Sequence, residues 1–370
     1  MIFIKQNIGI IYGGKSYEHE VSIITALMVF NNIDKEKYNV ELFYITKENK
    51  IIIASNLHDI DIYKLNKFKN MEEIFFYQEN NKTYYKSINK PKKKGLLIEC
   101  MVVCCHGLHV EDGIISSILS FNNLAYTCSD NKASSIVQDK HYTKLFLNHY
   151  NINTLDYKVI NGYNLKNINN IKVQLTYPVI IKPAQLGSSV GINIARDVES
   201  FENGLKMSLN FENKLIIEPL LENFKEFNCA IYKYQNEFIT SSVEEINNIN
   251  PIYTYEDKYQ NKDIKKTLPA LISKEETEEI KELTKYIYQI FDLKGVVRID
   301  YIKHNNKLYV NEINNIPGSL SYYLFKYNNI SFTKLIDQLI KQAIIEKNKE
   351  IFKEENHFNI LNKKTITKFK

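Results

Sequence analysis

The chain has 370 residues, a length that suits two or three domains, with a net charge of +5 and 44% hydrophobic residues. It contains no run of about 18 apolar residues, which argues against a membrane span. Residues 1–8 show no signal-peptide pattern, and the five cysteines include no Cys-x-x-Cys pair. These two observations argue against a secreted disulfide framework and a zinc site. No basic-aromatic recognition motif accompanies the lysines, so we expect a cytoplasmic protein without a nucleic-acid or membrane partner.

The first third of the chain predicts an open α/β domain. A short apolar strand at residues 8–12 leads into a helix at 22–31, and a second strand follows at 38–45. After a polar, irregular stretch, residues 96–105 form an apolar run that is typical of a fully buried parallel strand. Together these elements predict a first domain over residues 1–137.

A glycine turn and the start of a helix lie together in residues 13–22, Gly-Gly-Lys-Ser-Tyr-Glu-His-Glu-Val-Ser. The N-terminus of a helix attracts anions, and the carboxylate of Glu18 is suited to hold an amino group. N-capping of the helix by Ser16 or Glu18 explains the same residues equally well.

A second polar loop, residues 106–113, follows the buried strand and begins with His106. The carboxyl end of a parallel strand is where α/β proteins bind ligands. The histidine and the two acids resemble a metal site, but we prefer a turn and a helix start for Glu111 and Asp112.

The middle of the chain, residues 138–217, predicts a second unit. A strand at 177–182 ends in Lys182 and runs into the loop Gly187–Gly191, whose backbone N–H groups and serine hydroxyls are suited to cover phosphate oxygens. An ordinary turn is the simpler explanation of such a loop taken alone. It lacks the Gly-Lys-Ser/Thr ending of a Walker loop, which disfavours a P-loop fold.

The third unit is predicted over residues 218–345 and contains a helix at about 275–290. The charged residues 346–370 predict a basic tail, either a surface helix or a loose segment.

Two strands of the third unit carry polar residues at a spacing of two. Arg298 and Asp300 lie on the first strand, and Glu312 and Asn314 on the second. If residues 304–307 form a tight turn, Asp300 lies opposite Glu312, and all four side chains share one face of a hairpin. Clustered oxygen donors suit Mg²⁺, and an adjacent arginine suits a phosphate or an oxyanion. A structural ion-pair cluster is the alternative.

These segments, in this order, resemble the D-alanine–D-alanine ligases of the ATP-grasp superfamily over nearly all of residues 7–345. The resemblance is carried by residues 13–22, 106–113, 139–140, 177–183, 187–191, 258–259, 298–300, 311–314 and 317–318. It implies an α/β (α+β) three-domain architecture with ATP between the central and C-terminal domains, and a homodimer. The implied reaction is ATP- and Mg²⁺-dependent ligation of two D-alanines through an acyl phosphate, for peptidoglycan synthesis.

The resemblance also implies roles for particular residues. Nucleotide binding is implied for Lys140, Lys182, Gly187, Ser189, Glu218, Leu221, Glu226 and Lys258. Substrate binding is implied for Glu18, which would hold the first ammonium group, and for His106, Gly318, Ser319, Tyr323 and Leu324. Catalytic roles are implied for Glu18, Ser188, Tyr259, Arg298 and Gly318, the last two at the oxyanion. Two Mg²⁺ ions, replaceable by Mn²⁺, are implied at Asp300, Glu312 and Asn314.

Three positions depart from the family pattern. Val110 replaces a usual glycine, Leu186 replaces a common acid, and Tyr323 replaces the serine that helps to bind the carboxylate of the second substrate. Ser319, Ser321 or the Tyr323 hydroxyl are candidates to take over that role. The alternatives are therefore the same chemistry with D-serine, D-lactate or another amino acid as second substrate, and a non-catalytic protein that binds nucleotide.

Overall fold

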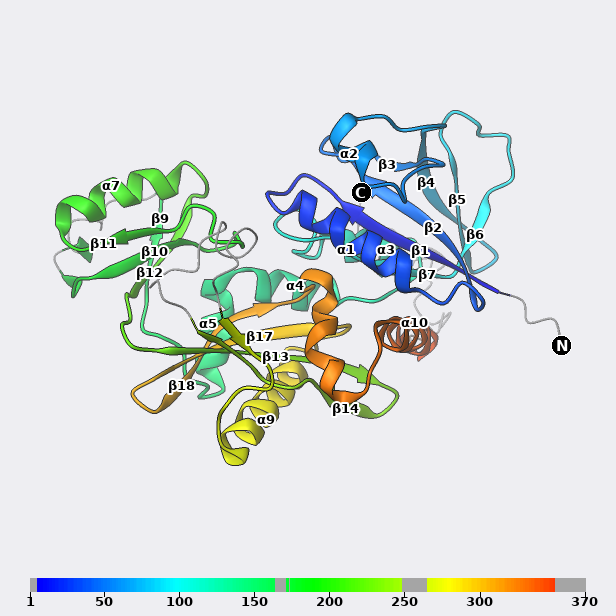
Figure 1. Cartoon of the computed structure of the whole chain (residues 1–370). Coiled ribbons are helices and arrows are strands. Elements are labelled where there is room, and N and C mark those ends of the chain that lie inside the picture. The colour runs from blue at the N-terminus through cyan, green and yellow to red at the C-terminus, as the bar shows by residue number, and fades with distance from the viewer. Residues whose placement is uncertain (1–4, 164–170, 173, 248–264, 350–370) are drawn as a thin grey trace, which may run out of the picture.

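A computed structural model (Figure 1) describes residues 5–163, 171–172, 174–247 and 265–349. Lys258 and Tyr259, which carry predicted roles, lie outside the described residues, as does most of the predicted tail. The described chain forms three β-sheets with helices packed against them. The second sheet and α7 stand beside the first sheet, and the third sheet lies below both in the view of Figure 1.

The first sheet has eight strands in the order β6-β5-β4-β3-β2-β1-β7-β8. The strands are β1 (Gln6–Gly13), β2 (Tyr38–Ile45), β3 (Ile51–Ile53), β4 (Glu72–Glu79), β5 (Lys82–Ser87), β6 (Leu96–Ile98), β7 (Cys100–Val103) and β8 (Ala125–Tyr126). The helices of this part are α1 (His19–Asn32), α2 (Asp61–Leu65) and α3 (Ile114–Phe121). Strands β2, β1, β7 and β8 run parallel, which confirms the predicted α/β class.

The predicted strand over residues 96–105 is two strands in the structure. β6 pairs antiparallel with β5, and β7 pairs parallel with β1 and β8. The chain crosses to β1 at Glu99, whose carboxylate accepts a hydrogen bond from the Asn7 amide at 2.8 Å. The prediction of one buried parallel strand is therefore wrong for the first half of the run, where Leu96 is 59% exposed, and right for β7, which is fully buried.

The second sheet has the antiparallel order β11-β10-β12-β9. Its elements are β9 (Lys158–Asn161), β10 (Val179–Pro183), β11 (Asn193–Ala195), α7 (Val198–Leu209) and β12 (Lys214–Pro219). Phe201 and Leu205 of α7 pack on the inner residues of β10 and β12, so this sheet has a small core of its own.

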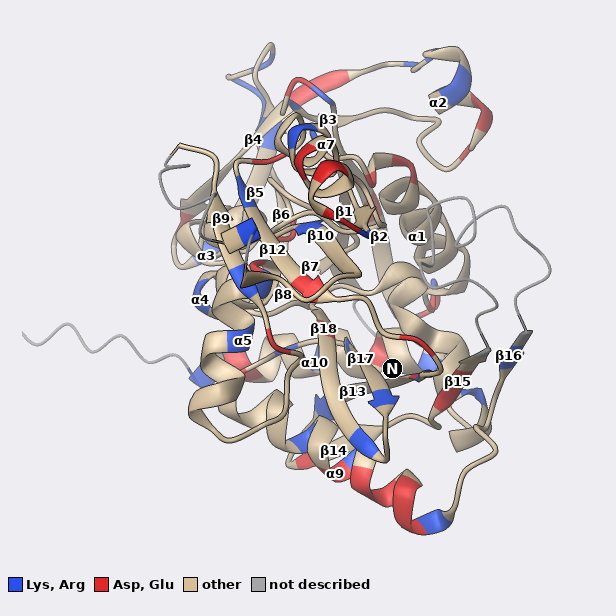
Figure 2. Cartoon of the chain, turned by 90° about the vertical axis from the view of Figure 1, so that its left-hand side faces the viewer, with Lys and Arg blue, Asp and Glu red and all other residues tan. Residues whose placement is uncertain are grey.

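The third sheet has the order β16-β15-β13-β17-β18, with β14 paired to β13. Its strands are β13 (Lys225–Tyr234), β14 (Glu237–Thr240), β15 (Glu244–Asn247), β16 (Lys265–Thr267), β17 (Val297–His304) and β18 (Lys307–Asn314). The remaining elements are α4 (Asn131–Gln138), α5 (Lys140–His149), α9 (Lys274–Ile290), the 3₁₀ segment η1 (Gly318–Asn328) and α10 (Phe332–Lys349). The helix predicted at 275–290 is confirmed as α9, which begins with a capping box between Ser273 and Glu276. Acidic residues gather in the first half of this helix, at the bottom of Figure 2.

Packing ties the three parts together. Leu147 of α5 joins the core of the third sheet, and Leu335 and Ile340 of α10 join the core of the first. The predicted domain boundaries at residues 137, 217 and 345 stay predictions. Among the described residues, no helix is long and apolar enough to cross a membrane.

Candidate active site

A cavity of about 500 Å³ lies where the three sheets meet. This volume is typical of small-molecule sites. Seventeen predicted residues line it: Glu18, His106, Lys140, Lys182, Gly187, Ser188, Ser189, Glu218, Leu221, Glu226, Arg298, Asp300, Glu312, Asn314, Gly318, Ser319 and Tyr323. Leu324 is the exception among the described residues, because its side chain is fully buried in the core of the first sheet.

The hairpin of β17 and β18 has the predicted register. Arg298 lies opposite Asn314, and Asp300 lies opposite Glu312. The turn is the two residues Asn305 and Asn306, with φ of 49° and 59°; asparagine tolerates this left-handed conformation, which matches the twist of the strands.

A β-bulge at Asn311 sets which side chains of β18 face the cavity. Asp300 pairs with Glu312, but the next residue, Tyr301, pairs with Val310, so Asn311 is an extra residue on β18. Val310 and Glu312 would otherwise share a face. Because of the bulge, Val310 lies in the core and Glu312 in the cavity.

Arg298 and Asp300 form a bidentate ion pair. Nε of Arg298 donates to Oδ1 of Asp300 at 2.7 Å, and its second nitrogen donates to Oδ2 at 2.8 Å. Nδ2 of the Asn314 side chain donates to the same Oδ2 at 3.0 Å. Burial works against the Arg298 cation, but Asp300 outweighs it and raises the pKa of Arg298 above its usual range. The guanidinium is thus charged and fixed in direction.

The donor set at the hairpin fits a hard cation that also binds phosphate. It offers two carboxylates, Asp300 and Glu312, and the amide oxygen of Asn314. In the described part of the chain, no group of three His, Cys, Asp or Glu side chains could hold a metal by itself. Mg²⁺ is usually bound in this way, by one or two carboxylates together with the phosphates of a substrate.

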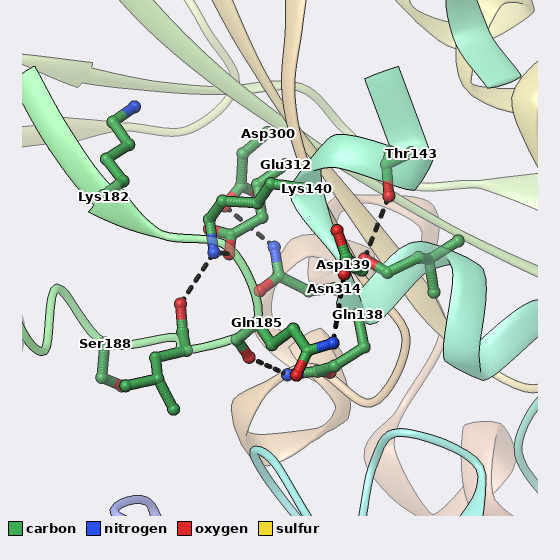
Figure 3. Close-up of polar contacts among 12 residues, drawn as sticks. Gln138, Asp139, Lys140, Thr143, Lys182, Gln185, Ser188, Asp300, Glu312 and Asn314 are labelled. Atoms are coloured by element: carbon green, nitrogen blue, oxygen red, sulfur yellow. Dashed lines mark hydrogen bonds and ion pairs between the residues drawn. The ribbon is translucent and has the colours of Figure 1, made fainter. Parts of the chain in front are cut away.

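Lys140 faces this hairpin from the first turn of α5 (Figure 3). Its ammonium donates to the carbonyl of Leu186 at 2.7 Å and lies 3.3 Å from Oε1 of Glu312. Asp139 fixes the helix start, since its carboxylate accepts from the amides of His141 and Tyr142 and pairs with Lys214.

Lys182 belongs to a second charged group, apart from Lys140 in Figure 3. Glu218 lies 2.6 Å from both the Lys182 and the Lys144 ammonium groups. Burial opposes ionisation of Glu218, but the two lysines outweigh it and lower its pKa to about 2. Sequence reasoning missed Lys144, although it lies four residues after Lys140 and therefore on the same helix face.

The loop Gly187–Gly191 reaches across to the first domain. The hydroxyl of Ser188 donates to the Glu18 carboxylate, and both Ser188 and Ser189 have positive φ. Glu18 occupies the N-cap position of α1, but its side chain makes no capping bond. The capping explanation is therefore wrong for Glu18; Ser16 accepts from the Glu18 amide at 3.0 Å.

Of the two acids in residues 106–113, only one takes part in a turn and helix start. The Asp112 carboxylate accepts from the amides of His109 and Ile114, as predicted for a turn and helix start. Glu111 is buried instead, and its two oxygens accept from the amides of Gly107 and Ile316. This bond to residue 316 has no signal in the local sequence, and the helix-start prediction is wrong for Glu111.

His106 is buried and makes a hydrogen bond with each ring nitrogen. Nδ1 donates to the Ile316 carbonyl at 2.7 Å, and Nε2 lies 2.9 Å from the Thr25 hydroxyl. Burial lowers the pKa of His106 to about 4, against a smaller raising effect of the Ile316 hydrogen bond. The ring is therefore neutral near pH 7.

We expect His106 to make folding sensitive to acid. Below its ordinary value near 6.5, the unfolded chain binds a proton on His106 that the folded chain excludes, so stability is fully present above pH 6.5 and falls towards pH 4. A shift of this size corresponds to about 3 kcal/mol. Urea unfolding at several pH values should show a steeper fall for the wild type than for His106→Gln. The exposed His58→Gln should behave as the wild type, and parallel curves for all three proteins would contradict the prediction.

Tyr323, which also lines the cavity, contacts a buried carboxylate. Its hydroxyl donates to Oε2 of Glu244 at 3.1 Å, and the Asn228 amide donates to the same oxygen at 3.1 Å. Ser319 lines the cavity, whereas Ser321 is fully buried and does not. Three residues were candidates to bind the carboxylate of the second substrate through a hydroxyl. Two of them, Ser319 and Tyr323, line the cavity, and Ser321 does not.

Comparison with known proteins agrees with this fold. Residues 7–129 match the family model "D-ala D-ala ligase N-terminus", and residues 146–341 match "D-ala D-ala ligase C-terminus". The D-alanine–D-alanine ligase of Thermosipho melanesiensis is 36% identical over 91% of this chain and 93% of its own length. The solved Helicobacter pylori D-alanine–D-alanine ligase has a TM-score of 0.74 and 26% identity, covering 90% of this chain and 98% of its own. The VanG D-Ala:D-Ser ligase of Enterococcus faecalis shares the fold, with a TM-score of 0.79 and 24% identity over 92% of this chain and all of its own.

The fold and the cavity define an ATP-dependent ligase with the three-domain ATP-grasp architecture. Within that class, the chain belongs to the D-alanine–D-alanine ligase family. Ligation of D-alanine with ATP, for peptidoglycan synthesis, is the activity of this family, and the chain is a ligase of this kind.

Proposed function

We propose that the protein forms D-alanyl-D-alanine through an acyl phosphate, with the residues of this cavity in the roles given below. The observation that carries the proposal is the convergence on one cavity of the Arg298–Asp300 pair, Glu312 and Lys140. A site that only binds nucleotide has no need for a guanidinium held in a fixed direction beside the carboxylates.

ATP would lie between the second and third sheets. Lys140 and Lys182 would bind its phosphates, with the amides of Gly187 and Ser189 covering them. Glu218, Leu221 and Glu226, which line the same cavity, would contact the adenine and the ribose. Lys182 would exchange its partner Glu218 for phosphate, while the buried Lys144 keeps Glu218 charged.

Two Mg²⁺ ions, with Mn²⁺ as a substitute, would be held by Asp300, Glu312 and Asn314. When bound, Mg²⁺ neutralises phosphate charge and orients the γ-phosphoryl group. The oxygen donors of the hairpin support this assignment.

In the first step, the carboxylate of one D-alanine attacks the γ-phosphorus of ATP, which gives an acyl phosphate and ADP. Glu18 would hold the ammonium group of this D-alanine, and Ser188 orients Glu18. The serine comes from the Gly187–Gly191 loop, so the same contact draws the loop over the cavity and helps to exclude water.

In the second step, the amine of the other D-alanine attacks the acyl carbon, and inorganic phosphate leaves. The oxyanion that forms would be stabilised by Arg298 and the N–H of Gly318. Arg298 is fixed by its two bonds to Asp300, so little reorganisation is needed. Ser319 and Tyr323 would contact the second substrate, and the Tyr323 departure keeps D-serine, D-lactate or another acceptor as the alternative.

We further propose a homodimer in the cytoplasm, supported by the family alone. Lys258 keeps its predicted role at the nucleotide, and Tyr259 keeps its predicted catalytic role.

Phosphate release with a panel of amino acids tests the proposal. We expect the protein to release phosphate from ATP when Mg²⁺ and D-alanine are both present, and mass spectrometry to identify D-alanyl-D-alanine. Mixtures of D-alanine with D-serine or D-lactate measure acceptor choice. A mixed product formed in preference to the dipeptide would reassign the second substrate, and ATP binding without phosphate release from any mixture would favour the non-catalytic alternative.

A further inference from the structure

The segment after β18 adopts a conformation that it cannot hold by itself. Ser319, Leu320 and Ser321 have φ of 52°, 49° and 47°, three successive non-glycine residues in the left-handed region. That region is unfavourable for L-residues, and runs of such residues are rare. The surrounding structure must therefore fix this segment, which carries Gly318.

Side chains of the first domain fix the residues on both sides of Gly318. On one side, Ile316 donates its N–H to Glu111 at 2.8 Å and accepts at its carbonyl from Nδ1 of His106 at 2.7 Å. On the other side, Ser319 donates its N–H to the Thr25 hydroxyl at 3.0 Å. The segment is thus held at three points, and α1, which contains Thr25, packs against η1.

The directions of these hydrogen bonds follow from the chemistry of the groups. The Ile316 carbonyl can only accept, so Nδ1 of His106 carries the proton and Nε2 is an acceptor. Thr25 must then donate its hydroxyl proton to Nε2, at 2.9 Å, which leaves a lone pair for the N–H of Ser319. Thr25 is fully buried, so a chain lacking its hydroxyl would leave Nε2 of the buried His106 and the N–H of the half-buried Ser319 without these partners.

We propose that Thr25 is a positioning residue, which acts with His106 to hold the Gly318 amide where the oxyanion forms. The proposal rests on the proposed function, since it assigns Thr25 to the second chemical step. Thr25 lies seven residues after Glu18, two turns along α1, so one helix face would serve both the ammonium group of the first substrate and the oxyanion donor of the second step.

The matched pair Thr25→Val and Thr25→Ser tests the proposal. Valine keeps the shape of the side chain and removes the hydroxyl, so we expect kcat to fall by about 10- to 100-fold while the KM for ATP stays unchanged. Serine restores the hydroxyl and should keep kcat close to the wild-type value. Thr83→Val, at another buried threonine whose hydroxyl donates to the Asn122 carbonyl and which does not line the cavity, controls for the general cost of a buried valine and should keep kcat.

Hydrogen exchange of the Ser319 amide gives a readout that does not need turnover. We expect faster exchange in Thr25→Val than in Thr25→Ser or the wild type. Equal loss of kcat in both Thr25 variants, or wild-type kcat and exchange in Thr25→Val, would overturn the proposal. If Thr25→Val does not fold, Thr25→Ala replaces it in the same comparison. A wild-type protein that forms no dipeptide would count against the proposed function, and the exchange result would still decide whether Thr25 holds the segment.

Discussion

Arg298→Lys is expected to lower kcat by about 100- to 1,000-fold, the range measured when one oxyanion donor is removed. Lysine keeps a positive charge beside Asp300, so the electrostatics of the carboxylate cluster change little. It cannot reproduce the two parallel hydrogen bonds of the guanidinium, at 2.7 and 2.8 Å, that fix its direction. ATP affinity, measured by calorimetry with a non-hydrolysable analogue, should stay within about twofold, because the proposed role arises only after phosphate transfer.

The composition of the chain supports this prediction. Arg298 is one of only two arginines among 48 lysines and arginines, so nearly every other cationic position uses lysine. The other arginine, Arg196, is exposed and outside the cavity. Arg196→Lys is therefore the matched control and should retain wild-type kcat. An equal loss of kcat and ATP affinity in Arg298→Lys would assign Arg298 to nucleotide binding instead.

The hairpin could be predicted from sequence because the residues that determine its pairing lie close together along the chain. Spacing by two predicted the shared face, provided that residues 304–307 form a tight turn, and the structure has that turn at Asn305 and Asn306. The bulge at Asn311 was missed, although the apolar residues Leu308, Val310 and Ile313 break the alternation of a regular strand and could have revealed it. The positions of Asp300 and Glu312 were nevertheless right, because both lie on the same side of the bulge.

Contacts between distant segments could not be predicted in this way. Glu111 resembles a helix start in sequence and instead bonds to Ile316, 205 residues away. Nothing in the local sequence around Thr25 connects it to Ser319, and the packing of α1 against η1 brings the two together. The side chains that line the cavity thus followed from residue type and order, whereas the groups that position them depend on the tertiary fold.

The proposed metal site gives the other large expected effect. Glu312→Gln removes one of the two carboxylate charges at the hairpin while keeping the size of the side chain. Two opposite unit charges about 4 Å apart attract each other by about 4 kcal/mol at an effective dielectric of 20. An energy of this size corresponds to roughly three orders of magnitude in the affinity for the cation. We therefore expect turnover at a fixed, low Mg²⁺ concentration to fall by about that factor and to recover partly as Mg²⁺ is raised.

Binding of Mn²⁺ to the protein with a non-hydrolysable ATP analogue, measured by electron paramagnetic resonance, separates metal binding from turnover. The Glu312→Gln complex should bind Mn²⁺ more weakly than the wild type. Because Lys140 lies 3.3 Å from Glu312, analogue binding without metal must be measured as well; it should not weaken, since Lys140 loses a competing carboxylate. Glu245→Gln is the control, because Glu245 pairs with Lys225 and does not line the cavity. Unchanged Mn²⁺ affinity in Glu312→Gln would leave Glu312 as a partner of Lys140 alone and would move the metal to Asp300 and the phosphates.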